Sequence, residues 1–112
     1  MAIEYILLDF LLENLTVPVY MEEPDELTSK YVLIEKTGAN VSDRINTATF
    51  ALQSYGASLE DAIDLNEEVK SVMDDLFYYD QSILSCKLNS DYNFTDSETK
   101  RYRYQAVYTI TY

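Results

Sequence analysis

The chain has 112 residues, 47% of them hydrophobic and 25% charged, a composition that predicts one globular domain over residues 1–112 and excludes a disordered chain. Twenty acidic residues against eight basic ones give a formal net charge of −12, which disfavours binding to nucleic-acid phosphates or to anionic membranes. The N-terminus carries acid where a targeting segment would carry base, and no apolar run is long enough to span a membrane. We therefore expect a soluble protein made in the cytoplasm.

The first expected element is an amphipathic helix over residues 3–15. Its apolar side chains recur at the i, i+3, i+4 and i+7 spacing of one helix face, and Pro18 prevents the helix from continuing. Residues 17–21 form a short run of β-branched and aromatic side chains around this proline. Because proline has no N–H to donate to a neighbour, the run predicts a strand at the edge of a sheet.

A loop is expected between the next two strands. Residues 31–37 and 44–55 are rich in β-branched and aromatic side chains and read as strands. The segment between them combines a glycine with asparagine, serine and aspartate, which favour turns. The predicted loop consists of Gly38, Ala39, Asn40, Val41, Ser42 and Asp43.

The most regular helix is expected soon after Gly56, over residues 58–77. Ser58 is well placed to cap its N-terminus, and apolar side chains from Leu59 to Phe77 form one continuous face. The opposite face is acidic, and its carboxylates include Asp64, Glu67, Glu68, Asp74 and Asp75. The plainest interpretation of this face is contact with solvent.

Two closing strands, residues 83–92 and 101–112, are expected to pair as an antiparallel hairpin. In the first strand, alternation places Cys86 and Leu88 on the apolar face and Asp91 on the other. The elements together predict an α+β fold. We expect a four-stranded, mainly antiparallel sheet with two helices packed on one face, in the order α-β-β-β-α-β-β, the first strand being short and at the edge.

The tail strand separates two kinds of side chain. Tyr102, Tyr104 and Tyr108 lie on one face, whereas Arg101 and Arg103 lie on the other. In so acidic a chain, the arginines favour an ion pair, either across strands or between subunits, over contact with nucleic acid. The tyrosines fit two interpretations, a half-exposed strand or an oligomer surface.

Residue chemistry gives no catalytic constellation. The chain has no histidine, the usual base near neutral pH and the commonest metal ligand, and it lacks the Gly-X-Ser-X-Gly elbow of serine hydrolases. Cys86, on an apolar face, is expected to be a buried and inert thiol. The acidic residues 22–26 lack the spacing of a calcium loop. We therefore expect no enzyme activity, no cofactor and no metal.

In its order of elements the chain resembles the tail terminator, or tail completion, family of long-tailed bacteriophages and their prophages. The resemblance lies in the strand of residues 31–38, the long strand of residues 44–55, the helix that opens at residues 58–62, and the closing hairpin. It covers residues 17–112 and consists of a similar size, a similar order of elements and a similar general character of the sequence, without an invariant motif. It implies an α/β subunit that assembles into a ring, usually a hexamer.

The resemblance also implies partners and a location. Such a ring caps the completed tail tube in the virion, binds the major tail tube protein and presents the surface that the head connector protein joins. DNA passes through the ring without specific binding. Carboxylates along the passage would repel the DNA backbone and keep it sliding.

Roles for particular residues follow from the resemblance. The predicted loop, residues 38–43, would project toward a neighbouring subunit or the tail tube. The sheet edges and the tyrosine face would make intersubunit contacts, and Arg101 and Arg103 would help offset the repulsion between neighbouring subunits. The acidic helix face would lie outside or line the lumen. Two alternatives stay open: another head–tail connector component, such as a head-completion or minor capsid protein, and an acidic stand-alone module that binds or inhibits its target by mimicking DNA.

Overall fold

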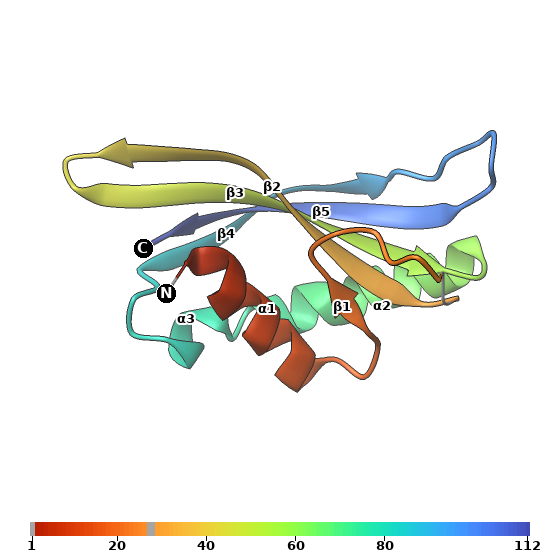
Figure 1. Ribbon diagram of the computed structural model, residues 1–112, viewed down its shortest axis with the longest axis horizontal. Helices are drawn as coiled ribbons and strands as arrows, with labels where there is room; N and C mark the ends of the chain where they lie inside the picture. The colour runs from red at the N-terminus through yellow and green to blue at the C-terminus, as the bar shows by residue number, and fades with distance from the viewer. Residues whose placement is uncertain (1, 27–28) are drawn as a thin grey trace.

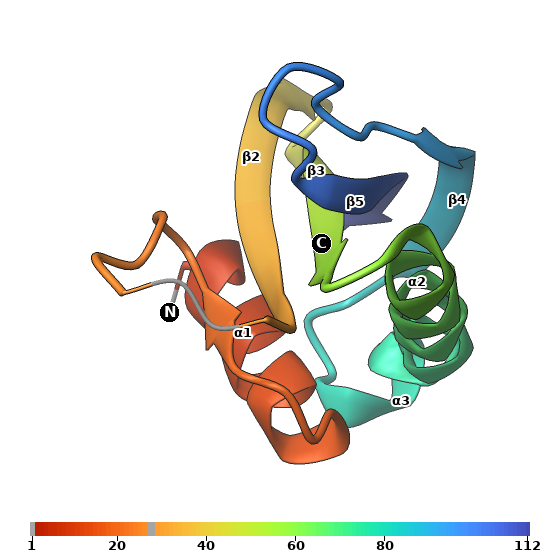
Figure 2. The ribbon, with the colours of Figure 1, turned by 90° about the vertical axis from the view of Figure 1, so that its right-hand side faces the viewer.

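Residues 2–26 and 29–112 are described by the computed structural model of the protein, in which helices cover one face of a twisted sheet (Figure 1, Figure 2). The strands of the described residues form one five-stranded sheet in the order β1-β2-β3-β5-β4. The elements in chain order are α1 (Ile3–Asn14), β1 (Val19–Tyr20), β2 (Tyr31–Ser42), β3 (Ile45–Gly56), α2 (Leu59–Met73), α3 (Leu76–Tyr79), β4 (Ser85–Asn93) and β5 (Tyr102–Thr111). The α+β class is thereby confirmed.

The sheet is larger and more mixed than the predicted four-stranded one. The short edge strand β1 belongs to it and runs parallel to β2, with Val19 beside Val32 and Tyr20 beside Leu33. The other neighbouring strands are antiparallel, including the closing pair β4 and β5 as predicted. Periodicity identifies a strand without showing which strand it bonds to. The number of strands in the sheet and the mixture of parallel and antiparallel pairs were therefore decided by the pairing of distant segments.

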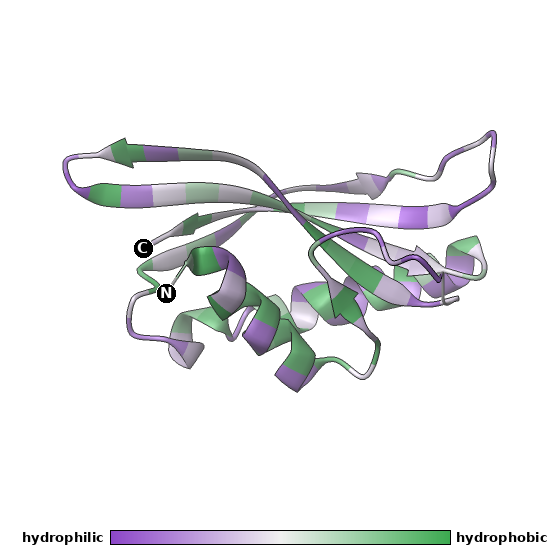
Figure 3. Ribbon diagram, viewed as in Figure 1, coloured by the Kyte–Doolittle hydropathy of each residue, from purple (hydrophilic) through white to green (hydrophobic). Residues whose placement is uncertain are grey.

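The core lies between the helices and the sheet. Apolar side chains of α1 and α2 pack against the even-numbered positions of β3 and β5, and Figure 3 shows apolar residues recurring along both helices. Gly56 lets the end of β3 pass close to α2, since a Cβ built there would lie 2.5 Å from the backbone N of Ala62. The largest fully buried side chains include Tyr31, Phe50, Leu7, Leu11, Leu52, Met73, Leu76 and Ile110.

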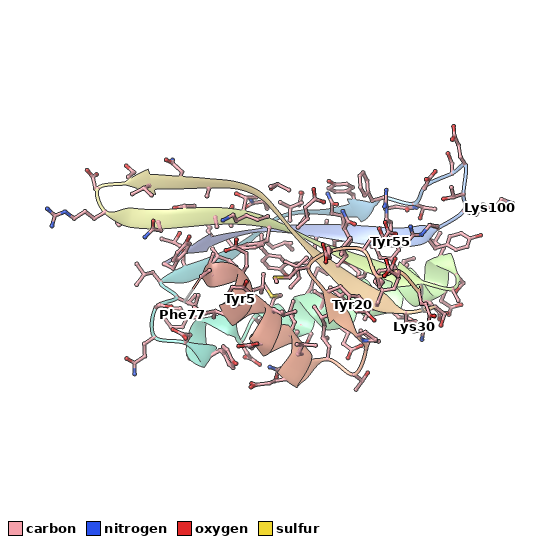
Figure 4. The ribbon with its side chains drawn as sticks, in the orientation of Figure 1. Tyr5, Tyr20, Lys30, Tyr55, Phe77 and Lys100 are labelled. Atoms are coloured by element: carbon pink, nitrogen blue, oxygen red, sulfur yellow. The ribbon has the colours of Figure 1, made fainter. Side chains whose placement is uncertain are left out.

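The long helix predicted over residues 58–77 is wrong at its C-terminal end. Ser58 caps α2 as expected, because its Oγ accepts a hydrogen bond from the N–H of Asp61 at 3.1 Å. α2 ends at Met73, and the short α3 follows after a turn. Phe77 consequently lies 49% exposed instead of continuing the buried face (Figure 4).

The predicted loop of residues 38–43 is also wrong, because residues 38–42 extend β2. They pair with residues 45–49 of β3, and only Asp43 and Arg44 form the turn. Both turn residues have a positive φ, 50° and 66°, as a two-residue type I′ hairpin requires. The asparagine and serine of this segment favour turns locally, but cross-strand pairing overrides such preferences.

A β-bulge in β4 makes one predicted facing wrong. The register with β5 passes from Leu88 directly to Ser90, so Asn89 is an extra residue in the strand. An extra residue reverses the alternation that follows it. Asp91 therefore lies opposite Ala106 and turns toward the helices, whereas strict alternation would have placed it on the other face of the sheet.

Candidate assembly surfaces

A two-stranded arm extends from one end of the molecule. We call residues 38–49 the hairpin arm; they are the paired ends of β2 and β3 with their turn. The molecule measures 43 × 25 × 25 Å, and the tip of the arm lies at one end of the longest axis (Figure 1). Near the tip, Val41 is 66% exposed and Ile45 is 46% exposed, and the hairpin end in Figure 3 carries apolar residues beside a polar turn. The segment predicted as a projecting loop is thus a strand at one end of the molecule, and what it contacts there stays a prediction.

The sheet leaves two long backbone edges without a neighbouring strand among the described residues. β1 covers β2 only at Val32 and Leu33, so the outer edge of β2 is open from Glu35 to Ser42, and all of these residues are exposed. β4 is the last strand on the opposite side of the sheet, and its residues from Lys87 onward are exposed (Figure 2). Open edges present unpaired N–H and C=O groups and favour pairing with another chain.

Arg101 forms its ion pair inside the subunit. Its guanidinium pairs with the carboxylate of Glu23, in the segment after β1, and donates a hydrogen bond to Tyr31 Oη. Its Cζ lies 4.8 Å from the ring centroid of Tyr55, which stacks on Tyr31 with the two ring centroids 4.4 Å apart. Figure 4 shows Tyr55 at the end of the sheet near Lys100. Arg101 thus forms an ion pair, but its partner lies in an irregular segment of the same chain and not on a neighbouring strand or another subunit.

A polar network beside Arg103, on the sheet face away from the helices, was missed by sequence reasoning. Arg103 donates to Tyr55 Oη at 2.8 Å and to the carbonyl oxygen of Phe94 at 2.7 Å. Gln53, which is 5% exposed, donates to Gln105 Oε1 at 2.9 Å and accepts from Tyr55 Oη at 3.1 Å. The sequence does carry a signal for this network. In each of two long strands, alternation places one of the two glutamines on the face opposite the apolar side chains, where the two amides could meet. The network holds the second arginine within the subunit.

The tyrosine row of β5 divides between the core and the surface. Tyr108 is 4% exposed and belongs to the core, and burial raises its pKa to about 12. Tyr102 and Tyr104 are half-buried nearer the other end of the strand. The predicted facing of Tyr108 is confirmed, but its assignment to an oligomer surface is wrong, because a buried side chain cannot contact a neighbour.

The acidic face predicted for the long helix is exposed. Its five members are Asp64, Glu67, Glu68, Asp74 and Asp75, all at exposed positions on α2 or in the turn after it. Glu67 also makes an ion pair with Lys70 Nζ at 2.9 Å. That these carboxylates line a lumen stays a prediction, because a lumen is formed by neighbouring subunits.

The bulge in β4 creates a polar cluster that alternation did not predict. Asp91 accepts hydrogen bonds from Asn66 Nδ2 at 2.7 Å and from Lys70 Nζ at 2.5 Å. Its hydrogen bond to Lys70, followed by that of Glu67, raises the pKa of the lysine. Because Asn66 and Lys70 belong to α2, these contacts attach an edge strand of the sheet to the helix layer.

Cys86 is a poor nucleophile. Its side chain is half-buried at the margin of the core, and desolvation, followed by the charge of Asp74, raises its pKa to about 11.

Across residues 2–26 and 29–112, no group of three or more acidic, cysteine or histidine side chains is arranged to hold a metal ion. Within the same residues, no helix is long and apolar enough to cross a membrane.

Comparison with known proteins adds no family to these observations. No protein-family model matches the chain, and no curated protein matches its sequence. The features of the molecule that bear on its function are therefore its surfaces, namely the hairpin arm, the two open edges and the acidic helix face.

Proposed function

We propose that the protein is a tail terminator of a long-tailed bacteriophage or prophage, a structural subunit whose hexameric ring caps the completed tail tube and presents the surface joined by the head connector. The observation that carries the proposal is the pair of open sheet edges on opposite sides of the subunit. A subunit with two different contact surfaces assembles head to tail, and such contacts close into rings when the rotation between neighbours permits.

The hairpin arm suits a second partner, the tail tube. Its β2 residues are exposed on both faces, and Val41 near the tip is 66% exposed. The arm extends along the strands, whereas the open edges face sideways, across the strands (Figure 1, Figure 2). In a ring whose subunits meet through their edges, the tips of the arms therefore extend beyond the intersubunit contacts and are free to reach a tube stacked on the ring.

The charge of the subunit fits a passage for DNA. Each chain carries a formal net charge of −12, and the acidic helix face is exposed. Carboxylates that face the passage would repel the phosphate backbone and prevent DNA from sticking. The same charge repels neighbouring subunits, so ring closure is expected to be favoured by screening salt.

Native mass measurement tests the proposal, with the protein alone and with tail tube protein, over a series of salt and protein concentrations. The expected result is a closed ring that binds the end of the tube. An arm-shortened variant would replace residues 40–47 with Asn-Gly, a two-residue turn that joins the register partners Ala39 and Ala48. The matched control is Asp43→Asn with Arg44→Gly, which keeps the arm at full length. The shortened variant should form rings without binding the tube, and the control should do both.

Other outcomes would assign the other functions. Monomers or dimers at every salt and protein concentration, with tail tube present, would overturn the proposal and favour the acidic stand-alone module. A ring that binds a head or capsid component but never the tube would identify a different head–tail connector component.

A further inference from the structure

The two open edges lie at the same height along the strands. One row of paired residues crosses the sheet from Gly38 through Thr49 and Thr109 to Lys87. The row begins on the open edge of β2 and ends on the open edge of β4. A second copy placed beside the first, at the same height, would therefore bring Gly38 of one copy next to Lys87 of the other.

The open parts of the two strands also match in length and direction. Residues 35–40 of β2 share rows with residues 85–90 of β4, except for Thr37 and Asn89, which are each skipped in the register, and β1 covers β2 only beyond these rows. β2 and β4 run antiparallel, since three antiparallel pairings separate them. In a neighbour of the same orientation, β4 would meet the β2 edge as an antiparallel strand, the pairing that already builds most of this sheet.

We propose that β4 of one subunit pairs with the open edge of β2 in the next, so that the sheet continues from subunit to subunit. This inference rests on the proposed ring and names the surfaces that build it. The partner is a second copy of this chain, and backbone N–H and C=O groups of both edges supply the hydrogen bonds. Because the two edges differ, an open chain of subunits keeps one free edge at each end until the ring closes.

Side chains on the sheet face away from the helices complement each other across this contact. Glu35 lies on that face, where its Oε2 accepts from Gln53 Nε2 at 3.4 Å. Lys87 lies on the same face, beside Thr109. Glu35 of one copy and Lys87 of the next would be diagonal cross-strand neighbours. Their attraction offsets part of the repulsion between two chains that each carry a formal charge of −12.

A disulfide trap tests the pairing directly. Gly38→Cys and Lys87→Cys are combined in a Cys86→Ala background. The first change fits because a Cβ at Gly38 meets no atom within 4 Å, and the second because Lys87 is exposed. Directly paired strands bring Cβ atoms within disulfide range, so oxidation should produce a ladder of covalent multimers up to the ring. The matched control carries Gly38→Cys with Glu68→Cys, which places the second thiol on the exposed face of α2.

A charge exchange gives a second measurement that does not depend on oxidation. Lys87→Glu replaces one attraction with a repulsion and should raise the protein concentration needed for assembly about fivefold, the equivalent of about 1 kcal/mol for each contact. Adding Glu35→Lys to it should restore assembly. Thermal unfolding of each variant checks that the subunit stays folded.

The outcomes separate this inference from the proposed function. Rings without a Gly38–Lys87 ladder, or without rescue by the charge exchange, overturn the edge pairing and leave the tail terminator proposal standing. A ladder and rescue in rings that never bind tail tube support the edge pairing and overturn the tail terminator. Monomers under all conditions overturn both.

Discussion

Lys70 Nζ of α2 lies 2.5 Å from Asp91 Oδ2 of β4, an ion pair made across the bulge in the edge strand. The two side chains are 22% and 24% exposed, so the pair is sheltered from solvent more than an ordinary surface salt bridge. Asn66 completes the contact with a hydrogen bond to Oδ1 of the same carboxylate. The helix layer thus fixes the position of the strand that we propose as an assembly edge.

Asp91→Asn should destabilise the subunit by about 1–2 kcal/mol, because two hydrogen bonds lose their charged acceptor. The raised pKa of Lys70 means that this stabilisation is present below the ordinary pKa of lysine, 10.5, and is lost as the pH rises above it. Urea unfolding at pH 7 measures the difference. Glu67→Gln is the control, since it removes an exposed contact of the same lysine and should cost under about 0.5 kcal/mol. Equal effects of the two variants would contradict the role given to Asp91.

Replacing each of the two glycines with alanine should change the stability of the protein in opposite directions. Gly56→Ala places a Cβ 2.5 Å from the backbone N of Ala62, and backbone cannot move aside cheaply. We expect a loss of about 2–3 kcal/mol in unfolding free energy. Gly38→Ala meets nothing within 4 Å and should change stability by no more than about 1 kcal/mol, in the stabilising direction. Thermal unfolding of both variants checks the pair, and a Gly56→Ala protein as stable as wild type would refute the close approach.

The thiol of Cys86 should react slowly until the pH is high. Desolvation raises its pKa from 9.0 to about 11, so the folded protein holds about 100-fold less thiolate at pH 8 than the unfolded chain. Iodoacetamide labelling, followed by mass, should accelerate about tenfold per pH unit up to that pKa. Labelling in urea provides the reference rate. A folded protein that labels at the unfolded rate would show that the thiol is not desolvated.

Glu4 should contribute to stability only above acidic pH. A backbone N–H of the first turn and, more weakly, Lys36 Nζ at 3.2 Å lower its pKa from the ordinary 4.5. A lowered pKa stabilises the folded state above pH 4.5, and this stabilisation is lost as the pH falls through the folded value. Glu4→Gln should therefore be less stable at pH 7 by about 0.5 kcal/mol, since the pair is one-third exposed. Urea unfolding at pH 7, 5 and 3 should show the difference disappearing, and a constant difference would contradict this account.

Most of the elements could be predicted because their signals are local. The stripe of α1, the Ser58 cap of α2 and the alternation that buries Tyr108 each arise within a few residues of chain. The stripe and the alternation arise because one face of a helix or strand is buried, and they look the same in any fold that buries that face. The α+β class followed from the order of these elements.

The predicted loop and the facing of Asp91 failed because both depend on strands far away in the chain. Residues 38–42 are strand because residues 45–49 pair with them, and Asp91 faces α2 because Asn89 is skipped in the register with β5. The cluster of Asp91 with Asn66 and Lys70 could not be predicted for the same reason.

The sequence by itself determined where most of the helices and strands form, which of their faces are mainly apolar, and that the chain is strongly acidic, because propensity, periodicity and charge are local or additive properties. Only the tertiary structure decided that Gly38 and Lys87 lie at the two ends of one row of paired residues, each on an open edge of the sheet. It also decided that Arg101 pairs with Glu23 inside the subunit. Hydrogen-bond register and long-range contacts are made between distant segments, and they exist only once those segments are packed together.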